Sequence, residues 1–161
     1  ARLQSGADAS AVARAEAKER LDALELLGGT VRAQGPGIRV TITENDGQIQ
    51  VGTLLDTIQE LRTVGAEAMQ FNGQVRIVAQ TSFSDDVGGI SVDGVTLEPP
   101  YVLDVIGDPD VLAGAMTFAL GPKAKVKRDG GELEVQKLSS LDIEAVRTPV
   151  QPEFAAPDAG Q

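Results

Sequence analysis

One stretch decides how this chain folds, Tyr-Val-Leu-Asp-Val-Ile-Gly-Asp-Pro at residues 101–109. Its first six residues are apolar except for Asp104, a pattern typical of a strand in the centre of a sheet. Asp108 and Pro109 are residue types that helices favour at the N-cap and at the first helical position. The stretch therefore predicts a central strand at 101–106 that leads directly into a helix.

The residues that follow complete this unit. The expected inner face of the helix holds Leu112, Ala115, Met116 and Ala119. Gly121-Pro122 ends the helix, and Lys125–Lys127 is interpreted as a short strand. A turn at 129–131 then leads into 132–136, where apolar and polar residues alternate as in a strand with one buried face.

Upstream, the sequence predicts a similar unit. Strict alternation of apolar and polar residues at 38–43 predicts a strand. Apolar residues at helical spacing predict a helix at 53–64. Thr53 is its expected N-cap and Asp56 its capping-box partner.

Two dipeptides in the middle of the chain indicate β-hairpins, Asn72-Gly73 and Asp93-Gly94. The strands they join are expected at 66–71, 75–79, 90–92 and 95–97. Residues 81–89 are interpreted as a polar loop. Pro99-Pro100 breaks the pattern, since a helix is disfavoured before proline.

The predicted order is strand–helix–strand, hairpin, strand–helix–strand. Two such units side by side form a split βαβ arrangement. We therefore expect an α+β fold at 35–147, a ferredoxin-like split βαβ sandwich with an inserted β-hairpin and an N-terminal helical arm.

The arm is predicted from residues 10–27, which are rich in Ala, Arg, Glu and Leu, and Gly28-Gly29 ends it. Its apolar stripe, at Leu21, Leu24 and Leu27, fades towards the N-terminus. Two interpretations stay open for residues 1–34: an arm that projects as the end of a coiled-coil stalk, or a helix packed on the sheet. The stripe further predicts that the arm pairs with a second copy of the chain.

The composition excludes much chemistry. Of 161 residues, 42% are hydrophobic and 24% are charged, with 14 basic against 24 acidic side chains, a formal charge of −10 at pH 7. The chain has no Cys, His or Trp, so disulfides, thiolate catalysis, Cys or His zinc sites and Ser-His-Asp triads are excluded. An acidic chain poor in aromatic residues is also not expected to bind nucleic acid. The basic cluster Lys123, Lys125, Lys127 and Arg128 is interpreted as a solvated strand or loop.

The two ends carry expectations about location. The chain begins at Ala1 without Met, so we expect the natural N-terminus, and any membrane anchor, to lie upstream. No apolar run here approaches the roughly 20 residues that span a bilayer, and we expect the chain as given to be soluble. The proline-rich residues 148–161 are expected to form a disordered tail.

Two segments of the chain resemble a known protein family. The segments 64–74, Val-Gly-Ala-Glu-Ala-Met-Gln-Phe-Asn-Gly-Gln, and 90–109, with Pro-Pro-Tyr followed by Gly-Asp-Pro, look like DUF881, a family of uncharacterised bacterial proteins. The leader at 35–41 fits its entry strand, and the resemblance covers roughly residues 21–138. The family often places Arg directly after Asn-Gly-Gln, where this chain has Val75 and then Arg76.

The resemblance implies a Gram-positive, often actinobacterial, source. It also implies one N-terminal membrane helix, a short coiled-coil stalk and an extracytoplasmic domain, in proteins discussed alongside envelope and cell-division genes. The family has no established activity and supplies no catalytic residues.

Acid/base catalysis by paired carboxylates is the chemistry most open to this chain. Asp104 would need a partner if its strand buried it, and we expect it to point to solvent instead. Asp108, which Pro109 separates from Asp110, is interpreted as a helix cap. Asp85-Asp86 is interpreted as part of a solvated loop rather than a Ca²⁺ site, because that ion takes about six to eight oxygen ligands.

The remaining motifs have structural interpretations. Gly35-Pro36-Gly37 lacks the pattern of a phosphate loop and is interpreted as a turn. Pro99-Pro100-Tyr101 could present the only Tyr in a binding groove, but we favour the entry to an edge strand with a cis peptide bond. No His is present to activate Ser82, Ser84 or Ser91.

Two functional hypotheses follow. The preferred one is a non-enzymatic interaction or scaffold domain of a membrane-anchored envelope protein, which binds protein partners and requires no cofactor or metal. The alternative is a small-ligand-binding domain or a carboxylate-dependent hydrolase, with Asp104, Glu67 or Tyr101 at its site. We assign no catalytic, cofactor-binding or metal-binding residue.

Overall fold

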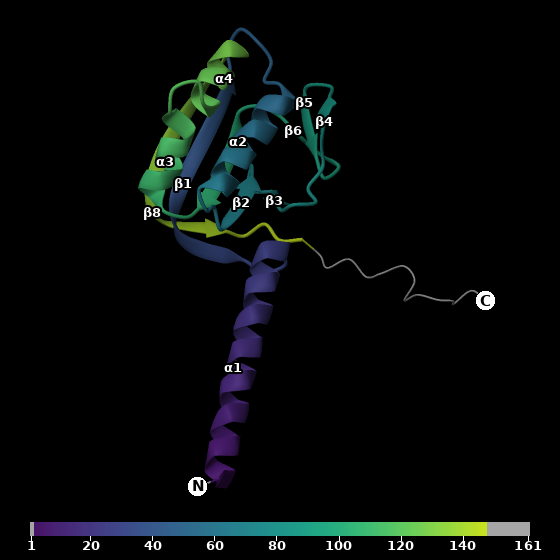
Figure 1. The fold of residues 1–161 in the computed structure, drawn as a ribbon. Coiled ribbons are helices and arrows are strands. Elements are labelled where there is room, and N and C mark those ends of the chain that lie inside the picture. Colours follow the sequence, from purple (N-terminus) through teal and green to yellow (C-terminus); the bar gives the residue numbers. More distant parts are fainter. Residues whose placement is uncertain (1, 148–161) are drawn as a thin grey trace, which may run out of the picture.

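The computed structural model describes residues 2–147, and their side chains from residue 9 onward. The predicted tail at 148–161 lies outside the described residues. The helices are α1 (Arg2–Gly28), α2 (Val51–Thr63), α3 (Pro109–Thr117) and α4 (Pro122–Arg128). The strands are β1 (Ala33–Glu44), β2 (Ala68–Phe71), β3 (Val75–Ile77), β4 (Phe83–Asp86), β5 (Gly89–Val92), β6 (Val95–Leu97), β7 (Tyr101–Ile106) and β8 (Gly131–Ile143). Helices and antiparallel sheets thus share one domain, which confirms the expected mixture of α and β structure (Figure 1).

The main sheet has five strands in the order β3-β2-β7-β1-β8, and every neighbouring pair is antiparallel. Strand β7 lies between β2 and β1, so the run at 101–106 does form a central strand. Its entry at Pro99-Pro100 has a cis peptide bond. The expectation that Pro99-Pro100-Tyr101 enters an edge strand is wrong, because both sides of β7 are paired.

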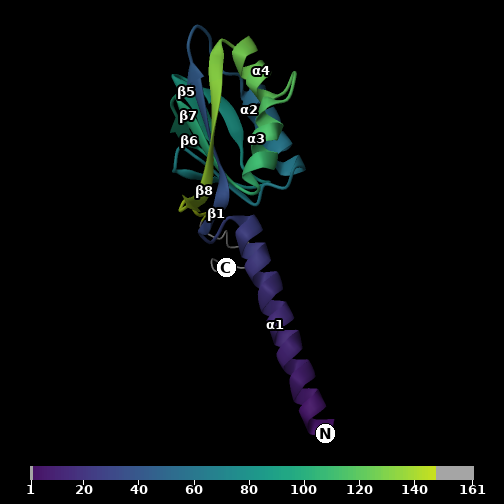
Figure 2. The ribbon, with the colours of Figure 1, turned by 90° about the vertical axis from the view of Figure 1, so that its left-hand side faces the viewer.

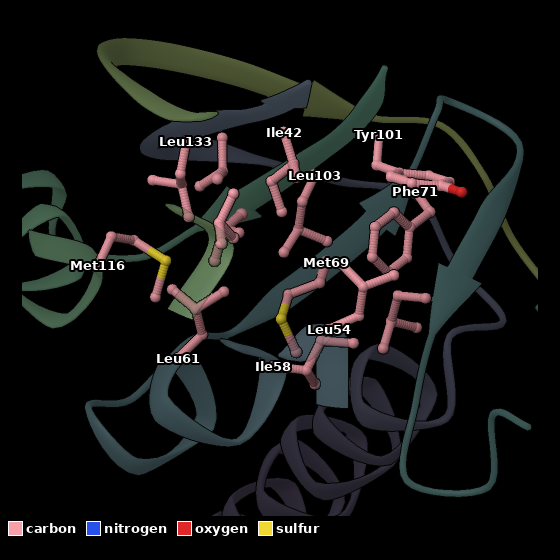
Figure 3. Close-up of a cluster of buried hydrophobic side chains, with 14 of the residues drawn as sticks. Ile42, Leu54, Ile58, Leu61, Met69, Phe71, Tyr101, Leu103, Met116 and Leu133 are labelled. Carbon is pink, nitrogen blue, oxygen red and sulfur yellow. The ribbon is translucent and has the colours of Figure 1, made fainter. Parts of the chain in front are cut away.

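Helices α2, α3 and α4 cover one face of the main sheet (Figure 2). None of them covers the opposite face, where, among the described helices, only the last turn of α1 packs, with Leu26 against a small cluster that includes Ala68 and Ile106. The covered face carries the alternate apolar residues of the strands, such as Ile38, Val40 and Ile42 of β1, none of which is exposed. Figure 3 shows Leu54, Ile58 and Leu61 of α2 against this apolar layer. Burial of these side chains is the main stabilisation of the domain, at about 25 cal/mol per Å² of apolar surface removed from water.

The middle of the chain forms a second, three-stranded sheet in the order β4-β5-β6. Both predicted hairpins are confirmed, since Asn72, Gly73, Asp93 and Gly94 all have positive φ, as their tight turns require. The prediction of a polar loop at 81–89 is wrong because it contains β4, which pairs with β5. As an edge strand, β4 exposes Ser84, Asp85 and Asp86, so no apolar alternation reveals it.

The basic segment near the C-terminal end also differs from its prediction. Residues 125–127 belong to α4 and not to a strand. Only Pro122 and Val126 of α4 are buried, and a single apolar residue between two lysines fits either period. Pro122 at the helix start and basic residues in the last turn favour the helix. Strand β8 then runs for 13 residues, well beyond the predicted 132–136.

The N-terminus of α2 is held by a distant part of the chain. Thr53 is not the N-cap: that position is Gln50, whose side chain makes no capping bond. Instead the Asp129 carboxylate accepts hydrogen bonds from the backbone N–H of Gln50 and the hydroxyl of Thr53. The predicted cap of α3 is confirmed, because Asp108 accepts from the N–H groups of Asp110 and Val111.

We expect Asp129→Ala to lower the free energy of unfolding by about 1–2 kcal/mol, because the Gln50 N–H and the Thr53 hydroxyl at the start of α2 lose their shared acceptor. Asp129→Asn keeps an acceptor oxygen and should retain most of the stability. Urea unfolding followed by circular dichroism measures both. Equal losses in the two variants would contradict the role of Asp129 as this acceptor.

Helix α1 projects away from the domain as an arm (Figures 1 and 2). It begins several residues before the predicted start and ends at the predicted glycines. Gly29 has φ +75°, the Gly29 N–H bonds to Leu26 O, and the Thr30 N–H bonds to Glu25 O. This is the Schellman C-cap that a helix followed by glycine favours. Of the two open interpretations, the structure has the projecting arm.

Candidate functional site

A polar row crosses the face of the main sheet opposite α2, α3 and α4. It consists of one residue from each strand, paired in register: Arg76, Gln70, Asp104, Arg39 and Gln136. Each lies directly opposite its neighbour, close enough for polar side chains to bond across the strands. We call this set the polar row.

Asp104 is the centre of the polar row, and the expectation that it points to solvent is wrong. It is only 5% exposed. The Arg39 Nε donates to Asp104 Oδ1 at 2.7 Å, and the Gln70 Nε2 donates to Oδ2 at 2.9 Å. The hydrogen bond and the charge of Asp104 raise the pKa of Arg39 above its usual value. The carboxylate is thus buried with the partners that such burial requires.

At the other end of the row, Arg76 binds both the base of the arm and the segment after β8. Its side chain is among the largest fully buried ones, at 1% exposure. The guanidinium donates to the carbonyl oxygens of Val31 at 2.6 Å, Leu26 at 3.1 Å and Ala145 at 3.2 Å. Ala145 is held twice, because its N–H donates to Gln70 Oε1 at 3.2 Å. We call these contacts the Arg76 clamp.

The clamp places a cation at the C-terminal end of α1, where the helix dipole favours positive charge. Burial lowers the pKa of Arg76 from its usual value, although a guanidinium stays charged in proteins. Gly29 makes the close approach possible, since a Cβ there would lie 2.8 Å from Arg76 Cγ and from Val78 Cγ1. The Arg147 N–H also bonds to Gly29 O at 2.7 Å, which ties the segment after β8 to the base of the arm.

The arm itself presents an apolar stripe to solvent. Leu21, Leu24 and Leu27 are 55%, 66% and 68% exposed, and Val12 is exposed as well. Val12 lies nine residues before Leu21 and therefore on the opposite side of the helix. We call Leu21, Leu24 and Leu27 the arm stripe. None of the described helices is both long and apolar enough to cross a membrane.

The structure does not bring together the three residues proposed for a catalytic or ligand site. Tyr101 is buried on the helix-covered face beside Phe71 (Figure 3), so it does not lie in a groove. Asp104 lies on the opposite face of the same strand. Glu67 is exposed in the loop before β2. The sheet therefore separates Tyr101 from the carboxylate with which it would have to act.

The other candidate carboxylates have local partners. Asp86 accepts from the Thr96 hydroxyl and the Val87 N–H, and these bonds lower its pKa. Asp110 accepts from Lys137 Nζ at 2.8 Å, and this hydrogen bond and charge lower its pKa as well. No group of three or more acidic side chains that could hold a metal ion occurs within the part of the chain that the structure describes.

Two hollows occur on the surface of the described residues. The larger, about 670 Å³, lies between α4 and the beginning of β8. The smaller, about 280 Å³, lies beside the base of the arm and is lined by residues 32–34 and 142–144. Neither is lined by Asp104, Glu67 or Tyr101.

Fold and site together define a mixed α/β domain whose projecting helical arm is clamped to a sheet by a buried arginine. The chain belongs to the DUF881 family, described as bacterial proteins of unknown function, whose model matches residues 20–156. The resemblance inferred from the sequence is thereby confirmed.

Several proteins are similar to this chain in sequence. The chain is 39% identical over 158 residues to the UPF0749 protein Rv1825 of Mycobacterium tuberculosis and to the UPF0749 protein Mb1856 of Mycobacterium bovis. Each alignment covers 96% of this chain and 54% of the relative. The chain is 26% identical over 128 residues to UPF0749 protein YlxW of Bacillus subtilis, covering 73% of this chain and 55% of that protein. The chain thus spans about half the length of the curated relatives it matches.

A solved structure has the same fold. The crystal structure of an uncharacterised conserved protein from Mycobacterium tuberculosis superposes with a TM-score of 0.79 at 40% identity, covering 86% of this chain and 99% of that chain. None of these names assigns an activity, so the function has to be argued from the geometry.

Sequence reasoning missed the polar row and the clamp. The available signal was a polar residue inside each apolar strand: Arg39, Gln70, Arg76 and Asp104 all interrupt such runs. Which of these residues pair with one another depends on the strand order and register. Arg39 and Asp104, for example, are 65 residues apart in the sequence. The family's Arg after Asn-Gly-Gln drew attention to Arg76 without indicating what it binds.

We expect Arg76→Met to lower the free energy of unfolding by about 3 kcal/mol, because three carbonyl groups lose their donor at once. Arg62→Met removes a guanidinium bonded to one carbonyl, Val78 O, and should cost about 1 kcal/mol. Urea unfolding measures both, and hydrogen exchange should show faster exchange at residues 26–31 only in the first variant. Equal losses, or unchanged exchange there, would contradict the clamp.

The Tyr101 hydroxyl should ionise at a higher pH than an exposed tyrosine does. Burial and the negative charges of Glu44 and Asp85 raise the pKa of Tyr101 from 10.0 to about 12. Since the folded-state pKa is the raised one, its contribution to stability is present below pH 10 and is lost as the pH rises towards about 12. The chain has one Tyr and no Trp, so near-ultraviolet absorbance reports this group alone. A phenolate midpoint at pH 10 with an unchanged circular dichroism spectrum would contradict the buried position.

Proposed function

We propose that this chain is a non-enzymatic interaction module of a membrane-anchored bacterial envelope protein, located outside the cytoplasm and serving envelope organisation or cell division. The observation that carries the proposal is the arm stripe, an exposed row of apolar side chains on a helix whose base is fixed by the Arg76 clamp. A clamped base gives the arm a defined direction from the domain. An upstream membrane segment would then hold the domain at a set distance from the bilayer.

The length of the arm supports a partner. Helix α1 has 27 residues, about 40 Å of helix. Within residues 9–28, whose side chains the structure describes, it contacts the domain at its last turns (Figure 1). Helices with few tertiary contacts are marginally stable in water, and most helices in proteins are stabilised by packing of an apolar face. A second helix along the arm stripe would supply that packing.

We propose a second copy of this chain as the partner of the arm, in a parallel coiled coil. With Leu21 and Leu24 at heptad positions a and d, Arg20 falls at g and Glu25 at e. In a parallel pair, the g residue of one helix faces the following e residue of the other. Arg20 and Glu25 then form two symmetric ion pairs between the copies.

We expect the chain to self-associate and the double substitution L21E/L24E to abolish this, because four acidic side chains would meet at the seam. The matched control A15E/A23E adds the same charge at heptad positions b and c, which face away from the seam, and should leave association unchanged. Analytical ultracentrifugation over a range of concentrations measures both.

The same variants test the role in the envelope. In cells, cross-linking in the full-length protein should capture complexes with the wild type and with A15E/A23E but not with L21E/L24E. A wild-type chain that stays monomeric at every concentration, and whose cross-linked complexes persist in L21E/L24E, would overturn the proposal.

We also propose that residues 35–147 form a ferredoxin-like split βαβ domain and residues 1–34 a separate arm. The support is the order β8-β1-β7-β2 within the sheet. Helix α2 connects β1 to β2, and α3 with α4 connects β7 to β8. Strand β3 extends this arrangement at one edge, and the small sheet is inserted between the two units.

A further inference from the structure

The main sheet has an open edge at β8. This strand is the last in the order β3-β2-β7-β1-β8 and has 13 residues. Figure 2 views the molecule from this side: β8 runs along the front, with α3 and α4 beside it. An edge strand of this length presents backbone groups that another strand can pair with.

The hydrogen-bond pattern identifies which backbone groups face outward. The Gly107 N–H bonds to Pro36 O, and the Asn45 N–H bonds to Gly130 O. Because antiparallel pairs alternate between bonded and non-bonded positions, Arg39, Thr41 and Thr43 bond to β8, and they pair with Gln136, Glu134 and Glu132. The N–H and C=O groups of residues 131, 133, 135 and 137 therefore point away from the sheet.

A groove runs beside this edge. The hollow of about 670 Å³ is lined by residues 130–134 of the edge and by Lys123 and Lys127 of α4. The two lysines are four residues apart, on one face of the helix. Lys137, on the same side of the sheet, contacts Asp110 of α3. Since Asp110 balances Lys137 and Asp46 also lines the hollow, the positive charge on the helix side of the edge comes from Lys123 and Lys127.

The other side of the same edge is acidic. Glu132 and Glu134 alternate with Leu133, which is buried towards the helices. Their side chains are exposed on the face opposite α2, α3 and α4, and both line the hollow. An added strand would therefore lie between positive charges on one face and negative charges on the other.

We propose that the β8 edge binds an extended segment of a partner protein by β-strand addition, with acidic side chains facing α4 and basic side chains facing Glu132 and Glu134. The outward N–H and C=O groups at 131–137 provide the main-chain bonds of this recognition mode, and the two charged walls provide its specificity. A strand presents successive side chains to opposite faces, so the partner segment alternates acidic and basic residues. This site is independent of the arm and goes beyond the function proposed for it.

The charges disfavour a second copy of this chain as the occupant. In a symmetric antiparallel pairing of two β8 strands that continues both faces of the sheet, the row containing Glu132 and Glu134 meets the same row of the partner. Like charges on facing rows destabilise such a pairing. Strand β8 carries no basic residue on that face to compensate.

The test uses a probe peptide, acetyl-EKVKEK-amide, which places Glu and Val on one face and Lys on the other. We expect the full chain to bind the fluorescently labelled peptide in an anisotropy titration. The scrambled peptide acetyl-KEEKVK-amide has the same composition without the alternation and should bind about tenfold more weakly. Equal binding of the two peptides would reject the predicted alternation.

Two pairs of variants locate the site. K123E/K127E reverses the basic wall and should weaken binding about tenfold, whereas K18E/R32E makes the same change in net charge elsewhere and should not. K137P removes an outward N–H without breaking a bond to β1 and should weaken binding more than K137A, which removes only the side chain. If K137P unfolds the chain, the charge pair still decides.

Besides equal binding of the two peptides, three results would overturn the proposal: absence of peptide binding, undiminished binding in K123E/K127E, and equal effects of K123E/K127E and K18E/R32E. Absence of peptide binding together with self-association that K137P abolishes would assign the edge to a second copy. The arm variant L21E/L24E should bind the peptide as the wild type does, so failure of the arm proposal and failure of this one are distinguishable.

Discussion

The structure depends on the buried guanidinium of Arg76. It sits between the last turn of α1, the link to β1 and the segment after β8, and it donates to a carbonyl of each. A buried cation is tolerated only where its donors are satisfied and the local field is favourable. The three carbonyl groups satisfy the donors, and Leu26 O at the negative end of α1 provides the favourable field. The same contacts that satisfy Arg76 therefore determine where the arm leaves the domain.

The polar row extends this constraint across the sheet. Gln70 connects Ala145 to Asp104, and Asp104 in turn binds Arg39. The two faces of the sheet thus have different roles: apolar packing under the helices provides stability, and directional bonds on the other face fix the base of the arm and the segment after β8. Among the described residues, every buried side-chain nitrogen and oxygen has a hydrogen-bond partner. Such a row is suited to holding a stalk in one orientation.

Two surfaces remain available to partners, and they differ in physical character. The arm stripe is apolar and narrow, which suits packing against another helix. The β8 edge is polar, with backbone donors and acceptors between walls of opposite charge, which suits an extended segment. Because the two surfaces use different chemistry and different elements, a protein carrying both could associate with its own copies and with another protein at the same time.

The sequence by itself determined the elements whose signals are local. The alternation at 38–43, the apolar run at 101–106, the hairpin turns at Asn72-Gly73 and Asp93-Gly94 and the Asp108 cap all depend on neighbouring residues, and all are present. Only the tertiary structure decided the burial of Asp104, the Arg76 clamp and the hydrogen bonds of Asp129 at the start of α2, since each joins residues far apart in the chain. Periodicity shows that successive residues of a strand point to opposite faces, whereas strand order and register decide which side chains meet on each face.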